Sequence, residues 1–262
     1  TGEPKKAVEC LERALKIALD NGYMETALRS YNNIALALPA EENERCMECY
    51  EKGLELAKKV GDIYNQSLIG FNLAGMHINM GNISKGVLLA NEAVALDRKT
   101  GNIFHLYTST VALGFAYQIL GESDKSEQCL KEALTVSQRL DSFQAISGGY
   151  DYLGLCHFDK GDYVKAKEFF EKLNDTLDKA GDKFSQMIRS PFLIWTYLEL
   201  GEIEKANNAI DNLHKFALEV QNKGLSADAD ALRAMLFRAQ KKWKESLELF
   251  EKSLQEYEAL NA

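Results

Sequence analysis

The sequence has few prolines, no long apolar run and no excess of basic residues, and each absence excludes a class of protein. Prolines occur only at positions 4, 39 and 191 of 262, and no low-complexity linker separates segments, so we expect continuous helix. The best apolar run, PFLIWTYLEL from Pro191, contains Glu199 and is shorter than the roughly 20 residues that cross a bilayer. A net charge of -8 leaves no surplus of Lys and Arg for phosphates or anionic lipid, which argues against nucleic acid and membranes as partners.

The chain also has no secretory signal, because it opens with TGEPKKAVE rather than a basic segment followed by an apolar one. It does not begin with Met, so we expect a fragment of a longer protein. Its five cysteines are an odd number, which favours a reducing compartment. These features predict a cytoplasmic protein.

Glycines recur at a fixed interval along the chain. Gly61, Gly101 and Gly181 are spaced in multiples of 40 residues, and a second series offset by 20 contains Gly81 and Gly121. Glycine adopts the left-handed conformation that ends many helices, so each of these positions predicts a helix C-terminus. Two such turns per repeat predict a helical hairpin of about 40 residues as the repeating unit. In these two series Asp141, Gln221 and Lys241 stand at positions where glycine is expected.

The interval divides the chain into a half repeat and six helix pairs within one domain, 1–262. The first helix pair is slightly irregular, because its turn at Pro39 is one residue shorter. The expected boundaries are 1–23 for the half repeat, then 24–64, 65–104, 105–144, 145–184, 185–224 and 225–262. We expect an all-α protein of stacked hairpins, because one hairpin cannot bury both of its apolar faces alone.

The pattern within each pair resembles the tetratricopeptide repeat. That family's hallmark is a Leu–Gly or Leu–Ala pair, an aromatic residue, a turn glycine, and then a small, a bulky and another small residue on the second helix. The repeat from residue 105 carries all of these as Leu113, Gly114, Tyr117, Gly121, Ser126, Leu130 and Ala133. The resemblance implies a right-handed superhelix with an inner groove. The last pair departs from it, with Arg233 in place of the Leu and Lys241 in place of the turn glycine.

The repeat is longer than the usual tetratricopeptide unit of 34 residues. This longer form resembles the repeats of Rap-type bacterial regulators, of Pins-like scaffolds, and of the sensor regions in MalT-like ATPase regulators and adenylate cyclases. The segment ALRSYNNIALAL from Ala27 is similar to the last group. The resemblance implies recognition or regulation rather than catalysis.

Residues that could carry chemistry fall at packing positions of the repeat. Cys46 and Cys49 form a CxxC pair, but no second pair exists to complete a four-ligand metal site, so we interpret the cysteines as packed thiols. His77 and His157 occupy the aromatic position of Tyr117, which predicts a packing role for both. No nucleophile motif or phosphate loop is present. We therefore expect no enzymatic activity, no cofactor and no metal.

The inner face of the predicted superhelix is the candidate partner-binding surface. In tetratricopeptide hairpins the residue after the Leu–Gly pair, and those four before and three after it, point into the groove. Here several are large and apolar, and an exposed apolar surface of this kind indicates a partner that covers it. The candidate residues are Arg29, Asn32, Leu36, Phe71, Ile78, Phe115, Asp151, Leu155, Phe158, Trp195, Leu198 and Arg238.

These positions leave more than one interpretation open. The apolar residues either receive a protein or peptide partner, such as an amphipathic helix, or pack against one another across a narrow lumen. The Lys and Asn pattern that clamps acidic peptide ends is absent, which disfavours that mode of binding. We therefore expect a recognition module of a larger signalling protein. The alternatives are a small-ligand or peptide-signal sensor that regulates an attached ATPase, cyclase or transcription factor, and a scaffold or oligomerisation arm; the oligomeric state does not follow from the sequence.

Overall fold

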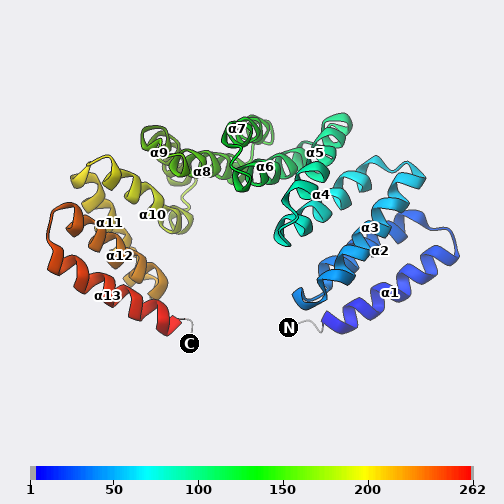
Figure 1. Cartoon of the computed structure of the whole chain (residues 1–262), viewed down its shortest axis with the longest axis horizontal. Helices are drawn as coiled ribbons and strands as arrows, with labels where there is room; N and C mark the ends of the chain where they lie inside the picture. The colour runs from blue at the N-terminus through cyan, green and yellow to red at the C-terminus, as the bar shows by residue number, and fades with distance from the viewer. Residues whose placement is uncertain (1–3, 261–262) are drawn as a thin grey trace. The chain divides into compact units, whose positions relative to one another are not determined.

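The computed structural model describes residues 4–260, and its regular elements are helices throughout that range (Figure 1). The helices form antiparallel hairpins, as the glycine spacing predicts. One short 3₁₀ helix, Ala40–Glu42, follows Pro39 at the irregular first hairpin. The α-helices are α1 Pro4–Asp20, α2 Met24–Ala37, α3 Asn43–Val60, α4 Ile63–Asn79, α5 Ile83–Thr100, α6 Ile103–Ile119, α7 Ser123–Arg139, α8 Phe143–Asp159, α9 Tyr163–Lys179, α10 Lys183–Glu199, α11 Ile203–Glu219, α12 Lys223–Ala239 and α13 Trp243–Leu260.

Left-handed glycines end the helices where the sequence predicts. Gly61 has a φ of 74°, and the next backbone N–H, that of Asp62, donates to the carbonyl of Ala57 at 3.0 Å. The Asp62 carboxylate then accepts a hydrogen bond from the backbone N–H of Asn65, also at 3.0 Å, and so caps α4. One dipeptide therefore ends a helix and begins the next, because glycine reverses the chain and aspartate caps the new N-terminus.

Three turns keep the same backbone without glycine. Asp141, Gln221 and Lys241 have φ values of 49°, 52° and 61°, and are the non-glycine residues with positive φ among residues 4–260. They stand at the three positions where the repeat departs from glycine. The repeat therefore fixes the turn geometry even where a side chain makes that conformation costly.

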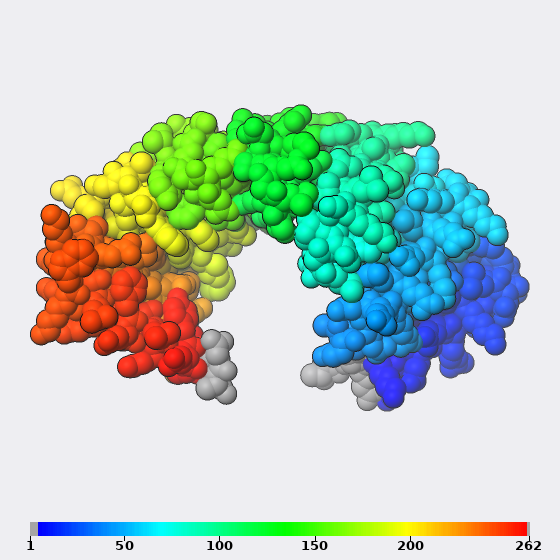
Figure 2. Space-filling view, in the orientation of Figure 1, coloured from blue at the N-terminus to red at the C-terminus, as the bar shows by residue number. Residues whose placement is uncertain are grey.

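The structure divides into two compact units, Thr1–Leu140 and Asp141–Ala262. The first contains α1 to α7 and the second α8 to α13. Within each unit, helices that are neighbours in the sequence pack side by side, and the surface is coloured in the same order (Figures 1 and 2). The expectation of one continuous domain over 1–262 stays a prediction.

Small residues lie where helices of a hairpin approach most closely. A Cβ added to Gly114 of α6 would lie 2.9 Å from Cδ2 of Leu130 on α7. A Cβ on Gly154 of α8 would lie 2.4 Å from the ring of Phe170 on α9. Both distances are too short for carbon atoms in contact, so these positions need glycine.

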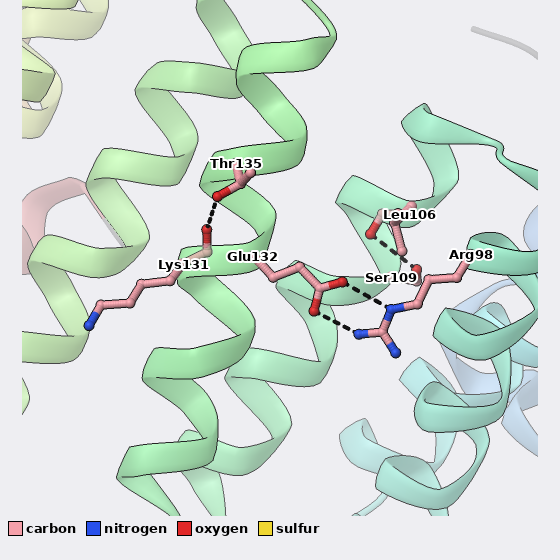
Figure 3. Close-up of polar contacts among 6 residues, drawn as sticks. All are labelled: Arg98, Leu106, Ser109, Lys131, Glu132 and Thr135. Carbon is pink, nitrogen blue, oxygen red and sulfur yellow. Dashed lines mark hydrogen bonds and ion pairs between the residues drawn. The ribbon is translucent and has the colours of Figure 1, made fainter.

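Polar side chains join successive helices in the first unit. The carboxylate of Asp97, buried at the end of α5, accepts hydrogen bonds from Ser67 of α4 and, at 2.8 Å, from Ser109 of α6. Next to it, the Arg98 guanidinium donates to both oxygens of Glu132 on α7, at 3.0 and 2.7 Å (Figure 3). These contacts fix how one hairpin sits on the next.

The histidines expected to fill packing positions do so. His77 and His157 are buried, and the ring of His157 stacks on Phe169 with centroids 5.5 Å apart.

Among the cysteines, Cys46 and Cys156 are buried, and Cys49 and Cys129 are half-buried. Cys10 is exposed, so the packing prediction is wrong for that residue. The reason is that α1 packs extensively against α2 alone, whereas internal helices have neighbours on both sides.

Candidate functional site

An internal proline distinguishes α10 from the other helices of the described chain. Pro191 has no backbone N–H, so the carbonyl of Met187 four residues earlier loses its usual helical partner. The hydroxyl of Ser190 donates to this carbonyl at 2.8 Å. The sequence thus compensates locally for the proline, and α10 continues on both sides of it.

An apolar depression of about 380 Å³ lies between α10 and α12, and we call it the α10–α12 groove. Three of its large side chains are unusually open for apolar residues: Ile188 is 44% exposed, and Phe192 and Trp195 are each 39% exposed. Asp228 is the charged residue in the lining. The groove is lined by Ile188, Pro191, Phe192 and Trp195 from α10, and by Asp228, Ala231, Leu232 and Met235 from α12.

A cluster of aromatic rings supports one side of this groove. Phe158 of α8 meets Trp195 edge to face, with centroids 5.2 Å apart and planes at 73°. The same ring meets Phe192 at 5.5 Å and Tyr163 at 5.4 Å. The indole N–H of Trp195 donates to Glu199 at 2.9 Å. Phe158 and Glu199 therefore hold the indole in one orientation while part of its surface stays exposed.

Charged residues near the groove are already engaged within the protein. Asp151 of α8 is buried and forms an ion pair with Arg189 of α10. Asp228 accepts a hydrogen bond from the hydroxyl of Tyr257 on α13. Burial, and then this contact with Asp228, raises the pKa of Tyr257, so its hydroxyl remains a donor at neutral pH.

The other sequence-predicted residues of the second unit occupy varied environments. Leu155 and Leu198 are half-buried and pack against the core of that unit, together with Phe158. Arg238 is exposed near the end of α12. Trp195 and Phe158 are thus the predicted residues of this unit that the structure brings together at an apolar opening.

The polar candidates of the first unit differ in exposure. Arg29 is exposed and lies 3.9 Å from Glu25 in the preceding turn of α2. Asn32 is buried, and its side-chain oxygen accepts a hydrogen bond from Asn72 of α4 at 2.8 Å. Arg29 is therefore accessible, whereas Asn32 joins neighbouring helices.

The apolar candidates of the first unit are open to different degrees. Leu36 of α2 is 63% exposed. Phe71 and Ile78 of α4 and Phe115 of α6 are half-buried. Each leaves some apolar surface accessible, which is compatible with a partner-binding role.

Sequence reasoning missed Ile188 and Phe192, although a signal for both is present. Counting four before and three after Trp195 selects Pro191 and Leu198, and so leaves these two residues out. Ile188, Phe192 and Trp195 follow one another at helical spacing and form one apolar stripe on α10. A search for a second stripe on a helix that already has a core-facing one would have found them.

Residues 4–260 were also compared with the requirements of a metal site and of a membrane-spanning helix. No group of three or more His, Cys, Asp or Glu side chains is arranged to hold a metal ion there. None of the helices in that range is long and apolar enough to cross a membrane.

One stretch of the sequence and the fold both match the tetratricopeptide repeat. Residues 109–139, which cover most of α6 and all of α7, match the family model for the tetratricopeptide repeat. The chain is built from tetratricopeptide-like repeats. No curated protein matches its sequence.

Solved structures of tetratricopeptide-repeat proteins resemble the chain over most of its length. A Pyrococcus horikoshii signal transduction ATPase with a tetratricopeptide repeat sensor is 17% identical with a TM-score of 0.77, over 97% of this chain and 42% of that one. Aspartyl phosphate phosphatase F from Bacillus subtilis is 12% identical with a TM-score of 0.69, over 92% and 74%. A Rap protein complexed with competence and sporulation factor is 14% identical with a TM-score of 0.59, over 91% and 76%. Identities this low establish the shared fold alone.

Proposed function

We propose that this tetratricopeptide-repeat chain is a protein- or peptide-recognition module of a larger cytoplasmic signalling protein, without catalytic activity of its own. Its α10–α12 groove receives the apolar face of an amphipathic helix. The observation that carries the proposal is the exposure of Ile188, Phe192 and Trp195 on one stripe of α10. Large apolar side chains that are held in place yet left open are typical of binding anchors.

The walls and lining of the groove suit the apolar side chains of a helix. Its walls are two helices, and its floor is apolar, so a third helix can lie between them with side chains at i, i+3 and i+4 pointing inward. Asp228 favours a basic or hydrogen-bond donor residue at one end of that helix. The first unit carries its own apolar candidates, Leu36, Phe71, Ile78 and Phe115, which we propose as recognition residues of that unit.

A pair of tryptophan variants tests this proposal. Affinity capture with the parent chain identifies partners, whose affinity is then measured for Trp195→Ala and for the control Trp243→Ala. Trp243 is 64% exposed on α13 and lies outside the groove. Its replacement therefore makes the same Trp-to-Ala change without altering the proposed site. Trp195→Ala is expected to weaken binding by about 2 kcal/mol or more, as aromatic anchors do. Equal affinities for the two variants would contradict the proposal.

A second candidate is a sensor that binds a peptide signal or a small ligand and regulates an attached ATPase, cyclase or transcription factor. The observation in its favour is the likeness of nearly the whole chain to the sensor-bearing ATPase from Pyrococcus horikoshii. In that case the ligand changes the activity of the attached domain, whereas a simple recognition module only recruits its partner. Assaying the full-length protein with and without the bound molecule distinguishes the two.

A further inference from the structure

A second groove lies on the opposite side of α10, between α9 and α11. It has a volume of about 500 Å³ and is distinct from the α10–α12 groove, because Gln186 and Ser190 point away from Ile188 and Phe192 around the helix. Its base is apolar, with Ile194 among the residues that line it. We call this opening the α9–α11 groove.

The hairpin of α10 and α11 departs from the other repeats at Ala209. Ala209 of α11 has the smallest side chain at its register position, where the other repeats have Cys49, Leu89, Cys129, Phe169 and Leu249. As a result α10 and α11 pack against each other less extensively than the helices of the other hairpins. The small side chain of Ala209 therefore leaves room between the two helices.

Amide side chains line the walls of the α9–α11 groove. Asn174 comes from α9, Gln186 from α10, and Asn208 and Asn212 from α11. None of the four has a side-chain hydrogen bond to another described residue, unlike Asn207, which bonds to Arg233. Each free amide offers one acceptor and two donors, the same groups that a peptide backbone needs.

The spacing of the α11 amides matches an extended peptide. Asn208 and Asn212 are one helical turn apart, a rise of about 6 Å along the axis. An extended chain repeats every second residue at about 6.6–6.8 Å. The two amides can thus bond to alternate residues of a strand lying along α11, and the side chains between them can point toward the apolar base.

The charge around this groove differs in sign from that of the whole chain. Lys183, Lys205 and Lys215 line it together with Glu219, in a protein whose net charge is -8. Lys205 lies 2.8 Å from Glu202, and Lys183 lies 3.9 Å from Glu219, whereas Lys215 has no ion pair among the described residues. A ligand carboxylate complements the ammonium group of Lys215.

We propose that the α9–α11 groove binds an extended acidic peptide segment. Asn208 and Asn212 hold its backbone, Lys215 faces its carboxylates, and alternate apolar side chains rest on the base. This site is independent of the α10–α12 groove, so its occupant differs from the helix proposed above in both conformation and charge.

A peptide-display library tests the site. Nonapeptides with Asp or Glu at alternate positions are selected on the parent chain beside a matched library with Lys or Arg at those positions. Enriched peptides are labelled, and their affinity is measured by fluorescence anisotropy. We expect binders from the acidic library alone, with affinity that falls as salt rises.

Variants then locate the binding. Ala209→Leu restores the residue type of Leu89 and fills the groove, and Asn208→Ala combined with Asn212→Ala removes the amides; each is expected to weaken binding at least about tenfold, or 1.4 kcal/mol. Lys215→Glu is compared with Lys244→Glu, a matched charge reversal on exposed α13. Trp195→Ala keeps full affinity for these peptides.

Melting curves accompany every variant. If Ala209→Leu lowers stability, the double asparagine variant tests the proposal instead, because Asn208 and Asn212 are both exposed and their side chains make no hydrogen bonds to described residues. The proposal is overturned if the acidic library yields no binder, if the basic library yields equal ones, or if folded variants bind as tightly as the parent. Loss of peptide binding in Trp195→Ala would also overturn it, since the peptides would then occupy the α10–α12 groove.

Discussion

The rings of Phe158 and Trp195 meet edge to face at 5.2 Å and so join α8 to α10 at the edge of the α10–α12 groove. The two residues share a contact but differ in burial: Phe158 is half-buried and touches three rings, whereas Trp195 is 39% exposed. This difference in burial predicts a structural role for Phe158 and a partner-binding role for Trp195.

Truncating the two rings is expected to have opposite main effects. Phe158→Ala removes contacts with Tyr163, Phe192 and Trp195 and should lower the free energy of unfolding by about 2–3 kcal/mol. Trp195→Ala should lower it by about 1 kcal/mol or less, with its main effect on partner affinity. Thermal melts and affinity measurements on the same samples check this. A larger stability loss for Trp195→Ala would mean that the indole is a packing residue.

Two helical glycines give a matched test of close packing. Gly154→Ala places a Cβ 2.4 Å from the buried ring of Phe170, so we expect a loss of about 1–3 kcal/mol in the free energy of unfolding. Gly75→Ala meets nothing within 4 Å, so we expect a gain of about 0.5–1 kcal/mol from better helix propensity. Denaturant titration measures both changes. The same sign for the two substitutions would refute the packing assignment.

The left-handed turns without glycine are sites where stability can be gained. Gln221 and Lys241 hold φ values of 52° and 61°, and such a conformation costs a side-chain-bearing residue about 1 kcal/mol. Gln221→Gly and Lys241→Gly should therefore raise the melting temperature. The reverse change at an equivalent turn, Gly201→Gln, should lower it, since Gly201 has a φ of 71°. Calorimetry on the three variants checks the order.

Acid is expected to weaken the first unit through His77. Burial first, and the Lys85 ammonium second, lower the pKa of His77, with Glu51 acting weakly in the opposite direction. Below its ordinary pKa of 6.5 the unfolded chain takes up a proton that the folded chain still excludes, so the free energy of unfolding falls as pH drops through that value.

His77→Phe keeps an aromatic ring at this position and removes the titration. The stability difference between about pH 7.5 and about pH 5.5 should then be smaller in the variant than in the parent, because the imidazole contribution is gone. Chemical denaturation at the two pH values measures this. An unchanged difference would show that His77 binds protons equally in the folded and unfolded states over that range.

The cysteines should differ widely in alkylation rate. Burial raises the pKa of Cys46, and burial chiefly raises that of Cys129 to about 11, so both stay protonated near neutral pH. Cys10 is exposed. Iodoacetamide treatment followed by mass spectrometry should find Cys10 modified first, and Cys46 and Cys156 only after unfolding. Early modification of Cys46 would contradict its buried position.

The fold could be predicted from the sequence because one interval sets both the turns and the packing. Gly61 and its equivalents mark helix ends, and Gly114 marks a close helix crossing. The 40-residue interval therefore predicts the helical hairpins. The positions of Gln221 and Lys241 also follow, since the backbone keeps its left-handed turn after the glycine is lost.

The candidate site could be predicted only in part, because position in a repeat does not determine exposure. Asn32 and Asp151 stand at groove positions but are buried by Asn72 and Arg189, partners that lie 40 and 38 residues further along the chain. The α9–α11 groove depends on the space that the small side chain of Ala209 leaves unfilled. A space of this kind becomes visible only when the neighbouring helices are in place.

Among the described residues, the helices that pack extensively are immediate or next neighbours along the chain. Extensive helix packing therefore does not require a segment that is distant in the sequence. During synthesis each hairpin within a unit can therefore pack against the one before it soon after its second helix leaves the ribosome. The order in which the α10–α12 groove forms follows from this: α10 docks first and exposes Trp195, and the groove is complete once α12 has emerged. A partner present in the cell can thus reach the indole before translation of the chain has ended.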